Sequence, residues 1–357
     1  MRQALILARK GYGRTSPNPM VGALLVKKGK VIGEGWHKRA GAPHAEIEAI
    51  RSAANPREAT LYVTLEPCST VGRTTSCVDV VRTSGIRRVV MATIDPNPAH
   101  AGRGFRLLRD AGIGVTKGIL AEESSELNAA FNHWIVHGIP LVTVKAAITL
   151  DGRIATASGQ SKWITGLAAR RHGQHLRKGN DAILVGIETI LEDDPSLSVK
   201  GKLKARPLRR IVLDTHARTP LATNILNDEY SHLTTIVATV DAPKCRVDAV
   251  SKKVNVLVSP VRKGRVDLCW LLKRLGREEV TNLLVEGGGE VNASFLLGGL
   301  AHRVSLFYAP KILGGNDARR AVGGLGADGL SEALELGDVE WRRVGADLLL
   351  TAGITGA

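Results

Sequence analysis

Three residues that suit a transition metal stand far apart in the chain and have to converge for a metal site to form. His44 lies in Pro43-His44-Ala45-Glu46, Cys68 follows Pro67, and Cys77 comes nine positions later. Imidazole nitrogen and thiolate sulfur are typical zinc ligands, and a catalytic zinc takes three protein ligands and keeps a fourth position open. The set therefore predicts a fold that brings residues 44, 68 and 77 together around zinc.

Glu46, two positions after the histidine, is the candidate general acid and base. One imidazole and two thiolates cancel the charge of a zinc ion, so water is acidified less there than by three histidines and benefits from a nearby proton acceptor. A His-x-Glu followed by Pro-Cys is the pattern of zinc-dependent deaminases, in which the glutamate is not a ligand. A structural zinc is the alternative, but it needs a fourth ligand, and the sequence offers none near the other three.

The segments around these residues indicate the elements that carry them. Residues 45–50 have the apolar period of a helix, and residues 59–65 read as a strand that leads to Cys68. A second helix is expected after Cys77. Helix N-termini at these positions would favour thiolate over thiol, because the positive end of the helix dipole stabilises an anion.

Strand and helix patterns alternate along the chain and predict a layered α/β protein with two domains. The first domain is expected to close with a single helix over residues 122–136. Gly138 and Pro140 follow it and are typical of a helix end. We therefore place the two domains at residues 1–140 and 141–357.

The second half contains polar loops after buried strands, which is where α/β proteins bind ligands. Thr165 is expected to cap a helix, and a strand over 281–285 leads into Glu286-Gly287-Gly288-Gly289 before a helix over 291–297. Backbone amides of such a loop at a helix start suit a phosphate. Three glycines also make a plain tight turn, and their spacing is not that of the dinucleotide fingerprint.

Composition limits the class of protein. A chain of 357 residues with 44% hydrophobic residues is long enough for two cores, and it has no apolar run of membrane-spanning length. The N-terminal segment reads as an amphipathic helix and lacks the features of a signal peptide. Two of the four cysteines are assigned to the metal, so we do not expect a disulfide framework. We therefore expect a cytoplasmic location.

The net charge of +15 is compatible with nucleic acid, an anionic surface or phosphorylated small molecules as partners. The basic residues are scattered in pairs such as Arg87-Arg88, and only 4% of the residues are aromatic and able to stack on bases. We therefore favour a phosphorylated small molecule over nucleic acid or a membrane.

Beyond these patterns, the chain resembles the bifunctional deaminase/reductase family of riboflavin biosynthesis over nearly its whole length. The first half carries Thr15-Ser16-Pro17-Asn18-Pro19, Gly41-Ala42-Pro43-His44-Ala45-Glu46, and Glu66-Pro67-Cys68-Ser69 with Gly72-Arg73-Thr74 before Cys77. The second half carries Leu150-Asp151-Gly152-Arg153, Ser161-Lys162-Trp163-Ile164-Thr165, Asp193-Asp194-Pro195 and Val285-Glu286-Gly287-Gly288. Two motif sets in the family's order support the resemblance.

The resemblance implies an N-terminal cytidine-deaminase-like α/β/α domain and a C-terminal domain similar to dihydrofolate reductase. It implies zinc-dependent deamination of 2,5-diamino-6-(5-phosphoribosylamino)pyrimidin-4-one, followed by reduction of the ribosyl side chain to ribityl with NADPH. A homo-oligomer is expected. The rival hypothesis is a nucleic-acid base deaminase with an accessory domain.

The family's functional residues carry over position by position. Those implied to line the cofactor are Ala147, Trp163, Thr189, Asp193, Thr215, Gly287, Gly288 and Gly289. Those implied to contact substrate are Asn18, Ser161, Arg177, Leu197, Lys200 and Glu286. Asn18, held between two prolines, suits an amide aimed at a heterocycle, and a plain turn residue is the alternative.

Four positions depart from the family's usual pattern. Thr70 replaces a common histidine, Thr75-Ser76 replace residues that are often prolines, and Lys200 replaces a frequent arginine. None of these changes removes a metal ligand. Lys200 keeps the charge of arginine but loses its bidentate fork.

Overall fold

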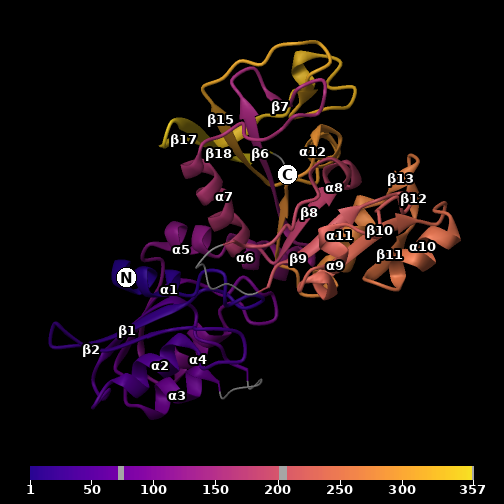
Figure 1. Ribbon diagram of the computed structural model, residues 1–357. Coiled ribbons are helices and arrows are strands. Elements are labelled where there is room, and N and C mark those ends of the chain that lie inside the picture. The colour runs from indigo at the N-terminus through magenta and orange to yellow at the C-terminus, as the bar shows by residue number, and fades with distance from the viewer. Residues whose placement is uncertain (71–75, 201–206, 356–357) are drawn as a thin grey trace. The chain divides into compact units, whose positions relative to one another are not determined.

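The computed structural model describes residues 1–70, 76–200 and 207–355. Motif residues 72–75 therefore lie outside the described part of the chain. The chain divides into two compact units, Met1–Gly138 and Ile139–Ala357 (Figure 1). Among the described residues, no helix has the length and apolar character that crossing a membrane requires.

The first unit is built on a five-stranded sheet with the order β2-β1-β3-β4-β5. β1 is antiparallel to both β2 and β3, whereas β3, β4 and β5 are parallel. The strands are β1 (Gly22–Lys27), β2 (Lys30–Trp36), β3 (Thr60–Leu65), β4 (Arg88–Thr93) and β5 (Gly114–Thr116), and the helices are α1 (Arg2–Arg9), α2 (Ala45–Ser52), α3 (Cys77–Thr83), α4 (Arg103–Asp110), α5 (Ala121–Leu127) and α6 (Ala129–His137).

Successive side chains of a strand point to opposite faces, and this alternation creates the three layers of the first unit. Leu24 of β1 packs with Ala4 and Leu7 of α1 on one face. Ala23 and Leu25 belong to the larger core formed with α2, α3 and α4 on the other face. The expected α/β/α arrangement is confirmed.

The helix predicted over residues 122–136 is wrong in one respect, because it is interrupted at Asn128 between α5 and α6. The Asn128 side chain accepts a hydrogen bond from the Met20 N–H (2.7 Å) and donates one to the Met20 carbonyl oxygen (2.9 Å). This pairing holds residue 128 outside helical geometry, with φ −111° and ψ 20°. A contact across 108 residues therefore outweighs the local helical pattern.

The second unit contains a nine-stranded sheet with the order β11-β10-β9-β8-β14-β6-β15-β18-β17. The first seven strands in that order are parallel, and the C-terminal hairpin adds two antiparallel strands. The sheet strands are β6 (Leu141–Thr149), β8 (Ala182–Gly186), β9 (Arg209–Leu213), β10 (Thr234–Thr239), β11 (Asn255–Ser259), β14 (Asn282–Val285), β15 (Arg303–Ala309), β17 (Leu336–Val344) and β18 (Asp347–Ile354), and short pairs join β7 (Arg153–Ala155) to β16 (Arg319–Arg320) and β12 (Val261–Arg262) to β13 (Arg265–Val266).

Helices cover both faces of this sheet, as buried parallel strands require. Leu184 and Ile211 pack with α11 and α12 in one core, whereas Ile183 and Val212 pack with α8, α9 and α10 in another. The helices of the second unit are α7 (Leu167–Gly179), α8 (Ile187–Asp193), α9 (Asn224–Asn227), α10 (Lys244–Ser251), α11 (Leu268–Arg277) and α12 (Gly289–Leu296), with short 3₁₀ turns at Ser231–Leu233 and Leu330–Glu332.

Thr165 is not the cap of α7, contrary to the expectation from sequence. The helix begins at Leu167, its N-cap position is Gly166, and the Gly166 N–H donates to a carboxylate oxygen of Asp347 at 2.8 Å. Asp347 is buried at the start of β18. The N-terminal end of the helix is thus held by a residue 181 positions away, which no local capping pattern reveals.

Candidate functional sites

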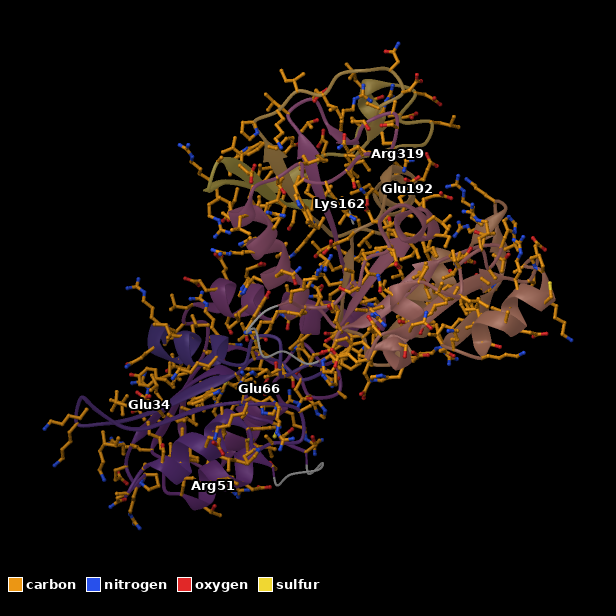
Figure 2. The ribbon with its side chains drawn as sticks, viewed as in Figure 1. Glu34, Arg51, Glu66, Lys162, Glu192 and Arg319 are labelled. Atoms are coloured by element: carbon orange, nitrogen blue, oxygen red, sulfur yellow. The ribbon has the colours of Figure 1, made fainter. Side chains whose placement is uncertain are left out.

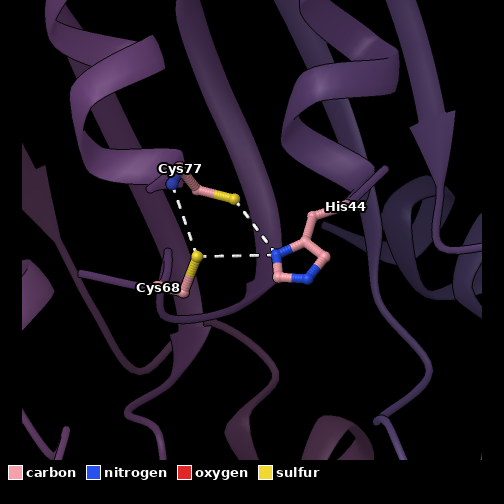
Figure 3. Close-up of side chains that lie close together, drawn as sticks. All are labelled: His44, Cys68 and Cys77. Carbon is pink, nitrogen blue, oxygen red and sulfur yellow. Dashed lines mark hydrogen bonds between the residues drawn. The ribbon is translucent and has the colours of Figure 1, made fainter. Parts of the chain in front are cut away.

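His44, Cys68 and Cys77 converge in the first unit (Figure 3). Their ligand atoms all lie within 4.8 Å of one another. His44 is the N-cap residue of α2, Cys77 is the first residue of α3, and Cys68 lies in the loop after β3. The residues that the sequence singled out as a metal set are therefore brought together by two helix starts and a strand end.

The spacing of the three residues fits a tetrahedral zinc. His44 Nδ1 lies 3.2 Å from Cys77 Sγ and 3.5 Å from Cys68 Sγ. Zinc–nitrogen and zinc–sulfur bonds of about 2.0 and 2.3 Å imply a nitrogen–sulfur edge of about 3.5 Å. In the described part of the chain, no other group of three or more His, Cys, Asp or Glu side chains has metal-ligand spacing.

The electrostatics of the cluster favour a cation. A hydrogen bond with Cys77 lowers the pKa of the Cys68 thiol to about 4, and the same contact raises the pKa of Cys77. The backbone N–H of Cys77 also donates to Cys68 Sγ at 3.3 Å. The two sulfurs therefore share one proton, and a dication at this position stabilises both as thiolates.

Glu46 lies in the first turn of α2 and is buried. Burial raises the pKa of its carboxyl to about 7, and its side chain is close enough to Cys77 to hydrogen bond. A carboxyl group with a pKa near neutrality can both accept and release a proton at physiological pH. Its position beside the sulfur cluster suits a proton carrier.

His37 is a residue of this site that the sequence analysis missed. It is buried, and its ring packs edge-on against His44 with 5.4 Å between the ring centroids. Its Nδ1 lies 3.2 Å from the Pro43 carbonyl oxygen, so Nδ1 carries the proton and Nε2 accepts from the Asn18 amide at 3.1 Å. His37 thus links Asn18 to the metal cluster, although these residues belong to different elements.

Asp95 is a second missed residue near the cluster. Burial raises the pKa of its carboxyl, and the negative charge of Cys68 contributes to the same shift. The loop that carries Asp95 is anchored by the buried carboxylate of Glu66, which accepts from the N–H groups of Asp95, Gly102 and Phe105. Glu66 is labelled in Figure 2. The acidic Asp-Pro-Asn-Pro run at 95–98, directly after a strand, was the available sequence signal.

In the second unit, most residues implied for the cofactor lie at the carboxyl edge of the parallel sheet. This edge is where open α/β sheets bind ligands. Ala147 lies late in β6, Thr189 and Asp193 lie in α8 directly after β8, Thr215 follows β9, and Gly287 to Gly289 follow β14.

Neighbouring residues limit which side chains fit in the glycine loop, Gly287 to Gly289. A Cβ on Gly287 would lie 2.5 Å from Val291, and one on Gly289 would lie 2.4 Å from the Arg320 carbonyl oxygen. A Cβ on Gly288 would meet nothing within 4 Å. Packing therefore requires glycine at 287 and 289, and the Gly288 backbone, at the N-cap of α12, is open to a phosphate.

Glu286 is the centre of a buried ion-pair cluster. Arg177 donates to both of its carboxylate oxygens at 2.9 Å, and Lys145 Nζ lies 3.5 Å from one of them. Burial alone would raise the pKa of Glu286, but the two cations outweigh it and lower the pKa to about 2. The structure thus joins two predicted substrate residues, Arg177 and Glu286, and adds Lys145, which the sequence analysis missed.

Ser161 and Trp163 come from the loop before α7. The Ser161 hydroxyl donates to Asp193 at 3.1 Å, and Nζ of Lys162, which is labelled in Figure 2, lies 3.2 Å from the same carboxylate. The Trp163 ring is exposed, and the Arg170 guanidinium lies 4.2 Å from its centroid. The loop is therefore tied to α8 through Asp193, which joins a predicted substrate residue to a predicted cofactor residue.

Leu197 and Lys200 lie on the segment that follows α8. Leu197 has a positive φ of 50°, and its side chain is buried in the core with α8. Lys200 is exposed, and its backbone N–H donates to Gln174 of α7 at 2.8 Å. The Leu197 side chain is therefore a core group, and only its backbone is available to a ligand.

Two family models match the chain. The RibD C-terminal domain model matches residues 140–350, and the cytidine and deoxycytidylate deaminase zinc-binding region matches residues 1–93. The riboflavin biosynthesis protein RibD of Actinobacillus pleuropneumoniae is 42% identical over 98% of this chain and 93% of its own length. This chain belongs to the RibD family. The RibD protein of Escherichia coli strain K12 is 39% identical over 98% of the chain and 97% of its own length.

Solved RibD structures agree with this membership. Acinetobacter baumannii RibD, form 1, has a TM-score of 0.88 and 34% identity over 99% of this chain and 97% of its own. A Thermotoga maritima protein, described as a diaminohydroxyphosphoribosylaminopyrimidine deaminase and 5-amino-6-(5-phosphoribosylamino)uracil reductase, has a TM-score of 0.87 and 34% identity over the same shares.

RibD membership confirms several expectations from the sequence. The fold class, the pairing of a zinc-dependent deaminase with a reductase in riboflavin biosynthesis, and zinc and NADPH as cofactors are all confirmed. A small-molecule substrate of that pathway agrees with the same findings. A nucleic-acid deaminase with an accessory domain is not favoured.

Proposed function

We propose that residues 1–140 deaminate 2,5-diamino-6-(5-phosphoribosylamino)pyrimidin-4-one and that residues 141–357 then reduce the ribosyl side chain of the product to ribityl. The convergence of His44, Cys68 and Cys77 beside buried Glu46 is the observation that carries the first half of this proposal. The ion-pair cluster of Glu286 at the carboxyl edge of a parallel sheet supports the second half.

In the deaminase site, His44, Cys68 and Cys77 would hold zinc, whose Lewis acidity activates water for attack on the amino-bearing ring carbon. Glu46 takes a proton from the water and delivers it to the substrate, so that the amino group leaves as ammonia. Its raised pKa suits both transfers. The Asn18 amide, held by His37, is positioned to hydrogen bond the heterocycle.

In the reductase site, NADPH supplies hydride to the sugar carbon, and the protein binds and orients both reactants. The open backbone of Gly288 at the start of α12 suits the pyrophosphate. Glu286 is an ionised acceptor for sugar hydroxyl groups, and Lys145 lies beside it with its ammonium group 3.5 Å from one carboxylate oxygen. Arg177 fixes the carboxylate of Glu286 through two hydrogen bonds, and Lys200 is available to the substrate phosphate.

The test of this proposal follows two signals in one reaction. Purified protein is incubated with the phosphoribosylated diaminopyrimidine, first without and then with NADPH, while ammonia and nicotinamide absorbance are measured. We expect ammonia without NADPH and oxidation of NADPH only after deamination. Release of ammonia from a DNA or RNA oligonucleotide, with none from the pyrimidine nucleotide, would instead support the rival deaminase.

We also infer a homo-oligomer that works in the cytoplasm without nucleic acid or membrane partners. Strand β17 lies at the sheet edge with Trp341 and Val339 exposed, and such an edge favours pairing with a second copy. All four cysteines are free thiols, which agrees with a reducing compartment. Light scattering of the purified protein tests the oligomer, and a monomer at micromolar concentration would contradict it.

A further inference from the structure

The order of the strands indicates which way NADPH runs across the second unit. β6, β14, β8 and β9 are consecutive in the sheet, and residues from the carboxyl end of each are proposed cofactor contacts. Strands lie about 4.8 Å apart, so β6 and β9 are separated by roughly 14 Å, the scale of an extended dinucleotide. Since the nicotinamide has to meet the sugar near Glu286 and Lys145, the adenosine end falls beyond β9.

Residues 214–219 after β9 and residues 239–240 at the end of β10 form a surface at that end, which we call the shelf. Buried Asp214 accepts hydrogen bonds from both the N–H and the hydroxyl of Thr219 at 2.7 Å, which holds the turn between them. The Thr215 carbonyl oxygen accepts from the N–H and the hydroxyl of Thr239, at 3.2 and 3.0 Å. Val240, the next residue after Thr239, is 67% exposed. The shelf therefore presents an apolar side chain beside two loops that are tied together.

Arg218 is the cation on this shelf. Its Nη2 donates to Glu188 Oε1 at 2.5 Å, and Glu188 is the neighbour of Thr189 in the first turn of α8. The two side chains are 42% and 63% exposed. Among the contacts of the described residues, Glu188 engages Nη2 of the guanidinium, and because the Arg218 side chain is 42% exposed, a ligand can reach the guanidinium from solvent.

We propose that Arg218 binds the 2′-phosphate of NADPH and that Glu188 weakens this binding by competing for the same guanidinium. The inference rests on the proposed reductase function and names the residue that selects NADPH over NADH. A guanidinium fork matches the oxygens of a phosphomonoester, and NADH has only a hydroxyl group at this position. The carboxylate of Glu188 both occupies a donor of Arg218 and repels the dianion.

The test uses the full-length protein and two kinds of measurement. Calorimetry gives the affinities for 2′,5′-ADP and 5′-ADP, and kinetics give kcat/KM for NADPH and NADH. Arg218→Ala should lower the affinity for 2′,5′-ADP and kcat/KM for NADPH by about 10- to 100-fold, since a charge-assisted contact is lost. Binding of 5′-ADP and kcat/KM for NADH should not change.

Glu188→Gln should raise the affinity for 2′,5′-ADP by about 2- to 10-fold, and it should also raise kcat/KM for NADPH. If the salt bridge had only a structural role, both variants would change the affinities in the same direction and would affect NADPH and NADH alike. That result would overturn the proposal. Arg274→Ala removes an exposed arginine of α11 that pairs with Glu278, the residue after that helix, and it is the matched control. It should leave every affinity unchanged.

Failure of this inference is distinguishable from failure of the proposed function. If the unaltered protein oxidises NADPH in preference to NADH, and Arg218→Ala keeps that preference, only the role of Arg218 is refuted. Loss of the preference in His216→Ala but not in Arg218→Ala would also refute it, because the imidazole of His216 is the other basic side chain in the same turn. If the unaltered protein binds neither NADPH nor 2′,5′-ADP, the reductase function itself is refuted.

Discussion

Glu46 of the first unit is buried beside a thiol, whereas Glu286 of the second unit is buried between Arg177 and Lys145. Burial raises the pKa of Glu46 to about 7, while the two cations reverse the effect of burial and lower the pKa of Glu286 to about 2. The same residue type is thus suited to exchange a proton near neutral pH in one unit and to keep its charge in the other. The neighbours, more than the burial, decide which task a glutamate performs.

The two sites also differ in how they are assembled. The metal cluster takes its residues from two helix starts and one loop within residues 44–77. The proposed reductase site takes Lys145, Arg177 and Glu286 from three segments that span 142 positions of sequence. Changing one ligand of the first site should therefore abolish metal binding. Removing one charged residue of the second site should instead leave the remaining buried charges unbalanced.

Changing Cys77 to Ser should have the largest effect, because it removes one of three zinc ligands. We expect loss of bound zinc, measured by elemental analysis, and loss of ammonia release. Cys245→Ser is the matched control, since Cys245 is exposed and lies in the second unit. Full zinc content in Cys77→Ser would show that the three residues are not the metal site.

Glu46→Gln keeps the size of the side chain but cannot accept a proton. Deamination should fall by about a hundredfold to ten-thousandfold while zinc stays bound. The variant should still reduce already deaminated substrate at a near-normal rate. Loss of that reduction in a folded variant would mean that the two activities share one site, contrary to the separation proposed here.

Arg177→Ala should destabilise the protein, because among the described ion pairs it leaves buried Glu286 with Lys145 alone. Breaking a buried ion pair by removing one member costs about 3–5 kcal/mol in the free energy of unfolding. Urea unfolding measures this cost. Arg265→Ala, which breaks an exposed pair with Glu290, is the control and should cost about 1 kcal/mol or less.

The stabilising effect of Glu286 should depend on pH. Its pKa is lower in the folded protein than in the unfolded chain, so its contribution is complete above about pH 4.5 and is lost as the pH falls towards 2. The shift corresponds to roughly 3 kcal/mol. The difference in unfolding free energy between the unaltered protein and Glu286→Gln should therefore shrink between pH 6 and pH 3. A constant difference would contradict the ionised state of Glu286.

Lys200→Ala should have the smallest effect. Lys200 is exposed, and its side chain has only the substrate phosphate as its proposed partner. We expect KM for the deaminated substrate to rise by about threefold to tenfold, without a change in ammonia release. Lys178→Ala removes another basic side chain of the second unit and serves as the control. An equal effect of both variants would assign Lys200 to general surface charge.

The features that could be predicted from sequence alone are those that depend on short contiguous motifs. The metal set and Glu46 were predicted from residue types and spacing, and the order of the two domains' motifs was predicted from a family resemblance. The alternation of strands and helices also predicted two layered α/β units. These features are local because each depends on neighbouring residues or on the side-chain period of one element.

Only the tertiary structure decided the features that depend on distant partners. Asn128 interrupts a helix by pairing with Met20, 108 positions away, and Asp347 caps α7 across 181 positions. His37 and Lys145 likewise became site residues through contacts that no motif encodes. The residue type determines which bonds a side chain can make. The packing of strands and helices determines which partner is close enough to make them.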